Sequence, residues 1–253
     1  MSDINREDLA KSIIDACLNM RKDGVNQGTS GNISIRYKDG MLITPSGMPY
    51  EIMTPDDIVF VDGNGKPEKD KIPSSEWRFH LSILKDNPTF NAVIHNHAIY
   101  SSMVSILNID YIPAIHYMVG VAGGNKIPCV KYATYGTQEL CDNISKSMKG
   151  YKACILKNHG LLAADETLQK AYHVMMEVEN LARLYMGVRG IGDYSILSDA
   201  EMEIVLEKFK NYGLNVKHKT KKTTKTTVKS SKSKKKWFLI IFYIRNNLKK
   251  GVF

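Results

Sequence analysis

Residues 74–97 read SSEWRFHLSILKDNPTFNAVIHNH and contain the signals of a helix, a turn and a buried strand. Ser74-Ser75-Glu76 is a typical helix opening, and the helix after it carries its apolar residues inward, namely Trp77, Leu81 and Leu84. Residues 92–94 form a short apolar run, as buried strands do, and lead directly into His95-Asn96-His97. A helix followed by a buried strand with polar residues at its end indicates an α/β fold.

The segments before this stretch fit the same class of fold. Apolar residues between positions 9 and 18 have helical spacing, and Gly24 ends this helix. Strands are expected at residues 33–37 and 41–43, on either side of the turn dipeptide Asp39-Gly40. The N-terminal part of the chain is therefore expected to supply one helix and a β-hairpin.

Helices and strands also alternate after residue 97. Thr137 is the expected N-cap of a helix that runs to Met148, and residues 153–156 form a buried strand. A long helix is expected at about residues 168–186, and a capping box at Ser198 opens the last helix. Since strands and helices are mixed without strict βαβ periodicity, we expect a single α/β domain whose mostly antiparallel central sheet is covered by helices.

Charge is distributed unevenly along the 253 residues, whose formal net charge is +9. Residues 217–253 contain 13 of the 35 Lys and Arg residues and no acidic residue. The remaining 22 basic and 26 acidic residues leave residues 1–216 with a net charge of −4. A hydrophobic content of 43% is enough for one sizeable core. This balance argues against a nucleic-acid enzyme with a basic groove, and against a mainly disordered or disulfide-stapled protein.

The composition predicts a catalytic domain at residues 1–216 and a separate tail at 217–253. Residues 217–236 are rich in Lys, Thr and Ser, so we expect them to be disordered. Residues 237–244 are apolar but too few to span a bilayer. Three interpretations of the tail stay open: peripheral contact with anionic membrane, non-specific contact with nucleic acid, and a neutral appendage.

The cysteines indicate a reducing compartment. Cys17, Cys129, Cys141 and Cys154 are widely spaced and include no CxxC pair, and residues 1–11 are polar. We therefore expect a cytoplasmic protein with reduced thiols.

The spacing of three histidines predicts a metal site. Strand residues at i and i+2 point to the same face, so His95 and His97 can reach one ion. His159 also follows a buried strand, and Gly160 after it allows a tight turn. Three neutral imidazoles with an open fourth position are typical of catalytic zinc. Local hydrogen bonding is the alternative for His95 and His97, and a structural role or local hydrogen bonding is our expectation for three further histidines, His80, His116 and His173.

Glu76 is the candidate acid–base residue, although a Glu near a helix start is commonly a surface residue favoured by the helix dipole. The hydroxyls of Ser74 and Ser75, together with free amides at a helix N-terminus, can bind an anion. Residues 44–47 and 28–32 are two further loops that are rich in hydroxyls and glycine. Together these features suggest a phosphate-binding cradle beside a metal and a carboxylate.

Several motifs occur in order along the chain: NQGTSGN at 26–32, LITPSG at 42–47, PSSEWRFH at 73–80, HNHA at 95–98, PAIHYM at 113–118, AGGN at 122–125, YATYGT at 132–137, NHG at 158–160 and KFKNYG at 208–213. In this series the sequence resembles the class II aldolase/adducin family from about residue 8 to residue 214. The resemblance implies an α/β aldolase domain that reversibly cleaves L-fuculose 1-phosphate, or a related deoxyketose 1-phosphate. The products would be dihydroxyacetone phosphate and an aldehyde such as L-lactaldehyde.

The resemblance also implies roles for individual residues. One Zn²⁺ per subunit would be held by His95, His97 and His159, with Glu76 as acid/base and as a further ligand at rest. Tyr117 would be a proton donor to the site of a neighbouring subunit in a homotetramer, and Tyr212 would shape the aldehyde pocket. The phosphorylated substrate would be bound by Gly31, Asn32, Ser46, Gly47, Ser74 and Ser75.

The chain departs from the family pattern at two motif positions. Ser46 stands where Thr is familiar, which keeps the hydroxyl, and Tyr135 stands where Phe is familiar, which leaves the aldehyde preference open. Other activities of the same fold also stay open: a pentulose-phosphate 4-epimerase, a methylthioribulose-phosphate dehydratase, or an aldolase for 5-deoxyribulose 1-phosphate. A non-catalytic, adducin-like binding module would lack a working site, and the intact set of three histidines and Glu76 argues against it.

Overall fold

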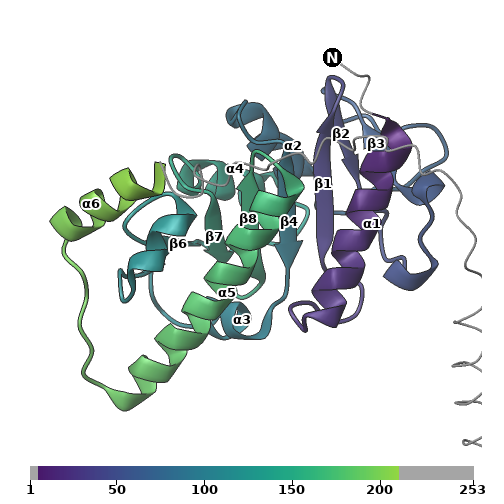
Figure 1. Cartoon of the computed structure of the whole chain (residues 1–253). Coiled ribbons are helices and arrows are strands. Elements are labelled where there is room, and N and C mark those ends of the chain that lie inside the picture. Colours follow the sequence, from purple (N-terminus) through teal and green to yellow (C-terminus); the bar gives the residue numbers. More distant parts are fainter. Residues whose placement is uncertain (1–4, 211–253) are drawn as a thin grey trace, which may run out of the picture. The chain divides into compact units, whose positions relative to one another are not determined.

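The computed structural model describes residues 5–210 (Figure 1). Tyr212, the domain boundary predicted near residue 216 and the whole predicted tail lie outside the described residues. Across residues 5–210, no helix has the length and apolar character needed to cross a bilayer.

The core of the fold is an eight-stranded sheet with the order β3-β2-β1-β4-β8-β7-β6-β5. Neighbouring strands are antiparallel except for β6 and β7, which are parallel. The prediction of a mostly antiparallel sheet is therefore confirmed. The strands are β1 (Asn32–Tyr37), β2 (Gly40–Ile43), β3 (Val59–Val61), β4 (Ala92–Asn96), β5 (Tyr111–Ile112), β6 (Ile127–Val130), β7 (Ala153–Leu156) and β8 (Gly160–Asp165).

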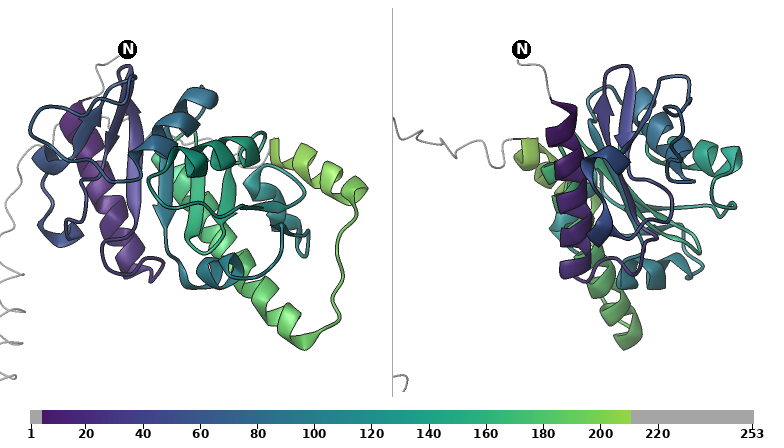
Figure 2. Two further views of the ribbon diagram at one scale, coloured as in Figure 1. Left: turned by 180° about the vertical axis from the view of Figure 1, so that it is seen from behind. Right: turned by 90° about the vertical axis from the view of Figure 1, so that its right-hand side faces the viewer.

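Helices cover both faces of this sheet (Figure 2). On one face lie α1 (Arg6–Lys22) and α5 (Leu168–Ile191), with α3 (Ile99–Ser105) packed along α5. On the other face lie α2 (Trp77–Asp86) and α4 (Gln138–Ser147). The final helix, α6 (Asp199–Lys210), packs against the 3₁₀ segment η3 (Tyr117–Ala122). The remaining 3₁₀ segments, near α1, are η1 (Tyr50–Ile52) and η2 (Pro55–Asp57).

Because both faces are covered, the central strands are apolar on both sides. In β4, Ala92 and Ile94 belong to the core under α1 and α5, whereas Val93 belongs to the core under α2 and α4. Side chains alternate along a strand, so His95 falls on the same side as Val93. The alternation of side chains along β4 therefore places His95 on the face of the sheet that carries α2 and α4.

The hairpin between β1 and β2 is confirmed, but its turn lies one residue earlier than predicted. Tyr37 pairs with Gly40, so the two turn residues are Lys38 and Asp39, and Lys38 adopts a φ of +52°. A Cβ on Gly40 would lie 2.0 Å from the carbonyl oxygen of Val61. Gly40 is therefore required by the close approach of β3 and not by the turn.

Some predicted helix boundaries also shift. Helix α2 begins at Trp77 and not at Ser74, with Glu76 at its N-cap. Helix α5 extends five residues beyond Met186, to Ile191. The predicted caps are confirmed, because the Thr137 hydroxyl accepts a hydrogen bond from the backbone N–H of Leu140 and Ser198 forms its capping box with Glu201.

Candidate active site

Strand β4 presents the first two histidines. His95 is the fourth residue of β4 and His97 follows the end of the strand, so both side chains lie on the face that carries α2. The His95 ring makes an edge-on contact with the ring of Phe79 in α2, with 5.7 Å between centroids. The expected i, i+2 arrangement of the two imidazoles is present.

The turn between β7 and β8 supplies the third histidine. Asn158 makes this turn tight with a φ of +54°, a role that the sequence pattern assigned to Gly160. Gly160 is needed for a different reason. A Cβ at this position would lie 2.4 Å from the carbonyl oxygen of Asn96 and 2.9 Å from Cδ2 of His97. Glycine therefore allows His159 to approach the end of β4.

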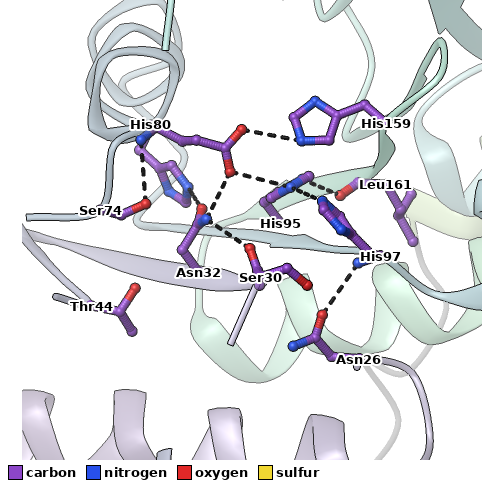
Figure 3. Close-up of polar contacts among 12 residues, drawn as sticks. Asn26, Ser30, Asn32, Thr44, Ser74, His80, His95, His97, His159 and Leu161 are labelled. Atoms are coloured by element: carbon purple, nitrogen blue, oxygen red, sulfur yellow. Dashed lines mark hydrogen bonds and ion pairs between the residues drawn. The ribbon is translucent and has the colours of Figure 1, made fainter. Parts of the chain in front are cut away.

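The three imidazoles converge on one point (Figure 3). One nitrogen from each of His95, His97 and His159 lies within 4.8 Å of the other two. The Nε2 atoms of His95 and His97 are 3.1 Å apart. Within the part of the chain that the structure describes, this is the one group of three or more potential protein ligands that meets in this way.

The protonation of these rings suits metal ligation. Nδ1 of His95 donates a hydrogen bond of 2.9 Å to the carbonyl oxygen of Leu161, which leaves Nε2 with its lone pair facing the cluster. Burial, reinforced by neighbouring histidines, lowers the pKa of His95 to about 3 and that of His159 to about 4. Burial also lowers the pKa of His97. All three rings are therefore neutral near pH 7.

Glu76 completes the cluster from the N-cap of α2. Its carboxylate is buried, with Oε2 3.3 Å from Nε2 of His95 and Oε1 3.2 Å from Nε2 of His159. Oε2 also accepts a hydrogen bond of 2.9 Å from Nδ2 of Asn32. Oε1 has no hydrogen-bond partner among residues 5–210.

These residues fit a divalent metal. A buried carboxylate oxygen without a hydrogen-bond partner is costly, and so are clustered imidazole lone pairs. A cation between the three nitrogens and Oε1 of Glu76 would satisfy all of these groups. Three imidazoles and one carboxylate are a donor set typical of zinc.

The candidate phosphate-binding segments run side by side. The backbone N–H of Ser74 donates to the carbonyl of Thr44, and that of Ser46 donates to the carbonyl of Ile72. Ser46, Gly47 and Ser75 are exposed. Ser74 is buried, and its hydroxyl accepts from the backbone N–H of Glu76 at 3.3 Å. Gly31 and Asn32 are buried in the adjoining loop and strand.

A cleft of about 290 Å³ opens over Glu76, His97 and His159. Ser75, one of the residues expected to bind substrate, lines this cleft. The sequence patterns did not single out the other lining residues as a group: Ser30, Tyr132, Ala133, Tyr135 and Asn158. Their position in the YATYGT and NHG motifs was the available signal.

Tyr117 lies elsewhere on the surface of the chain. It begins η3, is 48% exposed, and does not line the cleft. Its ring is 4.7 Å from the ring of His116 and 6.4 Å from that of Phe209, measured between centroids. Of the two tyrosines expected in the mechanism, Tyr117 is thus on the surface and away from the cleft, and Tyr212 lies outside the described residues.

Comparison with known proteins places these features in context. Residues 11–186 match the family described as Class II Aldolase and Adducin N-terminal domain. The L-fuculose phosphate aldolase of Escherichia coli (strain K12) is 54% identical over 214 residues, which cover 84% of this chain and 99% of that enzyme. A 5-methylthioribulose-1-phosphate/5-deoxyribulose-1-phosphate aldolase of Escherichia coli O45:K1 (strain S88 / ExPEC) is 54% identical over 212 residues, which cover 83% of this chain and 99% of that enzyme. A solved structure of an L-fuculose 1-phosphate aldolase matches with a TM-score of 0.79 at 37% identity, over 83% of this chain and 100% of the other.

Proposed function

Since the chain belongs to the class II aldolase and adducin family, we propose that it is a zinc-dependent aldolase acting on L-fuculose 1-phosphate or a related deoxyketose 1-phosphate. The reaction would reversibly give dihydroxyacetone phosphate and an aldehyde such as L-lactaldehyde. The protein is accordingly a lyase of carbon–carbon bonds. The observation that carries the proposal is the buried carboxylate of Glu76, which contacts two of the three clustered imidazoles beside an open cleft.

His95, His97 and His159 would hold one Zn²⁺ per subunit, with Glu76 as a further ligand before substrate binds. When bound, the ion supplies Lewis-acid polarisation of the substrate's carbonyl and hydroxyl oxygens. Support for a metal comes from the unpartnered Oε1 of Glu76 and from the hydrogen bond that orients His95.

The chain's own residues bind the substrate and move its protons. The phosphate would lie on the exposed hydroxyls and amides of Ser46, Gly47 and Ser75, with Ser74, Gly31 and Asn32 behind them. In the condensation direction, Glu76 would remove the proton from the hydroxyl-bearing carbon of dihydroxyacetone phosphate. That carbon then adds to the aldehyde, and a tyrosine donates a proton to the new alkoxide. Cleavage is the reverse of these steps.

We assign this proton-donating tyrosine to Tyr117 of a neighbouring subunit in a homotetramer. The support is that Tyr117 is exposed and does not line the cleft of its own subunit. A second copy would have to bring it to the site. Tyr212 would shape the aldehyde pocket from the segment after α6.

The protein would act in the cytoplasm, as its free cysteines suggest. Its tail would serve no catalytic role, whether or not it contacts anionic membrane or nucleic acid.

A second substrate class has direct support. The aldolase for 5-methylthioribulose 1-phosphate and 5-deoxyribulose 1-phosphate matches this chain at the same identity as the L-fuculose phosphate aldolase. Tyr135, which lines the cleft, adds a hydroxyl where the family commonly has Phe. A more polar cleft wall near the aldehyde end would alter the choice among these ketose phosphates.

The test is a cleavage screen with L-fuculose 1-phosphate, 5-deoxyribulose 1-phosphate and 5-methylthioribulose 1-phosphate. We expect release of dihydroxyacetone phosphate, loss of activity after prolonged chelation, and recovery with added zinc. His159→Asn should abolish activity, whereas His173→Asn, at an exposed position on α5, should not. Full activity in rigorously metal-free protein would contradict the metal mechanism. An epimerised or dehydrated product in place of dihydroxyacetone phosphate would instead assign one of the other activities of the fold.

A further inference from the structure

Three buried polar side chains, linked to one another by hydrogen bonds, lie behind Glu76. The Nε2 atom of His80 is 2.6 Å from Oδ1 of Asn32, and its Nδ1 atom is 2.8 Å from Oγ of Ser34. His80 and Ser34 are completely buried and Asn32 is 4% exposed. The Asn32 amide in turn contacts Oε2 of Glu76. From the sequence we expected a structural role or local hydrogen bonds for His80; its partners lie 46 and 48 residues away in the chain, and they connect it to the cluster.

The direction of each hydrogen bond follows from the carboxylate. An ionised carboxylate only accepts, so Asn32 must turn its Nδ2 toward Glu76 and its Oδ1 toward His80. Nε2 of His80 must therefore carry the hydrogen and donate to Oδ1. Burial lowers the pKa of His80 well below its ordinary value, so the ring is neutral and Nδ1 accepts from the hydroxyl of Ser34.

The pattern of strand pairing explains why these residues meet. Asn32 lies directly opposite His95 in the β1–β4 pairing, and Ser34 is two residues further along the same face of β1. His80 lies one helical turn after Glu76 at the start of α2. These hydrogen bonds are therefore fixed by β1, which pairs with the strand that carries the predicted metal ligand His95, and by α2, whose N-cap is the predicted base Glu76.

We propose that His80 and Ser34 are positioning residues that lock the amide of Asn32, so that it holds Oε2 of Glu76 and leaves Oε1 for proton transfer. This inference rests on the proposed function of Glu76. Without the donor on His80, the Asn32 amide can flip and present its oxygen to the carboxylate, where two acceptors would repel each other. The carboxylate would then lose its fixed orientation toward the substrate carbon.

The first test is the tautomer of His80, measured by long-range ¹H–¹⁵N NMR on the wild-type protein, with and without zinc. We expect hydrogen on Nε2 and a lone pair on Nδ1. Hydrogen on Nδ1 would overturn the proposal, because His80 could not then donate to Asn32. This measurement does not depend on aldolase activity. It therefore tests the hydrogen bonds of Ser34, His80 and Asn32 separately from the proposed function.

The second test compares His80→Phe with His80→Gln. Phe keeps the ring shape but removes the donor, whereas Gln keeps an N–H donor near the position of Nε2. His80→Phe should lower kcat roughly 10- to 100-fold, leave KM within about twofold and keep the wild-type zinc content. His80→Gln should recover most of the lost kcat, and Ser34→Ala should show a milder loss with the same pattern. An exposed control, His173→Phe, should change none of these values.

Two outcomes would contradict the positioning role. One is a wild-type kcat in both His80→Phe and Ser34→Ala. The other is a loss of kcat that matches a parallel loss of bound zinc or folded protein, since that result would make His80 merely structural. If the wild-type protein cleaves none of the ketose phosphates, the proposed function fails, and the tautomer measurement alone decides the hydrogen-bond chain.

Discussion

At the scale of single residues, Glu76 connects the histidine cluster to the hydrogen-bonded side chains behind it. One oxygen faces His159, and the other faces His95 and the amide of Asn32. A carboxylate shared in this way can act as a ligand or as a base, but its two oxygens are not equivalent. The oxygen without a hydrogen bond, Oε1, is the one available to a substrate proton.

Glu76→Gln should lower turnover by roughly 10²- to 10⁴-fold, because a positioned acid–base group contributes about that much. Binding of the phosphorylated substrate should survive, since Gln preserves the shape of the side chain. The measurement is solvent deuterium exchange into dihydroxyacetone phosphate together with kcat and KM. Near-normal exchange in the variant would mean that another residue is the base.

Ser75→Ala, at the position next to Glu76, should have a different effect from Glu76→Gln. Ser75 is exposed and lines the cleft, so its hydroxyl is placed to contact the substrate rather than the metal cluster. We therefore expect a higher KM for the ketose phosphate with a smaller change in kcat. A large fall in kcat with little change in KM would instead assign Ser75 to proton transfer and not to phosphate binding.

At the scale of elements, the contact between the β7–β8 turn and the end of β4 decides whether the histidines meet. His159 comes from the turn and His97 from the strand end, and the two can approach each other because Gly160 has no side chain. Strand β8 is paired with β4 along its length, so a displacement of the turn also disturbs the pairing at His95. The proposed metal site would therefore depend on a packing contact as well as on its ligands.

Gly160→Ala should weaken zinc binding and lower the melting temperature. Its Cβ would overlap the carbonyl oxygen of Asn96, at 2.4 Å, which is backbone and cannot move without shifting β4. Gly187→Ala is the control, because nothing lies within 4 Å of its Cβ in helix α5. Ala in place of Gly in a helix interior should stabilise by about 0.5–1 kcal/mol. Both variants would be measured for zinc affinity, by competition with a chelating dye, and for thermal unfolding. Unchanged zinc affinity in Gly160→Ala would contradict the prediction.

At the scale of the whole molecule, burying the histidines makes the stability of the metal-free protein depend on pH. The pKa of His95 is lowered to about 3 and that of His159 to about 4, from an ordinary value of 6.5. Below that ordinary value the unfolded chain binds protons that the folded chain does not. The free energy of unfolding should therefore be highest above about pH 6.5 and fall as the pH decreases toward the folded-state values.

Urea unfolding of the metal-free protein at several pH values measures this effect. His159→Gln removes one of the titrating groups, so its unfolding midpoint should change less between about pH 7 and pH 5 than that of the wild type. The exposed His173→Gln variant should follow the wild-type curve. Identical pH dependence in His159→Gln and the wild type would show that His159 is not held neutral by the fold.

Removal of residues 217–253 should leave cleavage activity and assembly intact, because the family resemblance and the described domain both end before this segment. A chain that ends before Phe209 should lose activity. The Phe209 ring lies near Gly120 and Tyr117 in η3, so losing it would disturb the tyrosine assigned to proton donation. Cleavage rates and mass by light scattering would compare the truncations with the full chain. Loss of catalysis in the chain of residues 1–216 would show that the tail belongs to the enzyme.

The same full-length and truncated proteins would decide among the interpretations of the tail. Pelleting with anionic vesicles tests membrane contact, and a binding assay with duplex DNA tests nucleic-acid contact. Binding to either, present in the full chain and lost in residues 1–216, would assign that role to the tail. If both proteins behave alike, the tail is a neutral appendage.

The sequence by itself determined the features that depend on near neighbours in the chain. The i, i+2 spacing of His95 and His97, the apolar run of β4 and the caps at Thr137 and Ser198 could all be predicted. Each depends on the periodicity of a helix or strand, or on a side chain reaching a nearby backbone N–H, and these are local properties. The end of a second buried strand also pointed to His159 and the opening of a helix to Glu76, and the family resemblance then joined them in one predicted site.

The tertiary structure alone decided the features that join distant segments. The turn at Lys38-Asp39 differs from the prediction because Gly40 is held against Val61 in another strand. Likewise, His80 is linked to Glu76 through Asn32, which is 48 residues away from His80. Asn32 is positioned by the pairing of β1 with β4, and His80 by the packing of α2 against the sheet. Strand register and helix docking set these distances, and neither is encoded in the local pattern of one segment. The sequence identified Glu76 as a candidate, but its orientation was determined by packing between segments that are distant in the sequence.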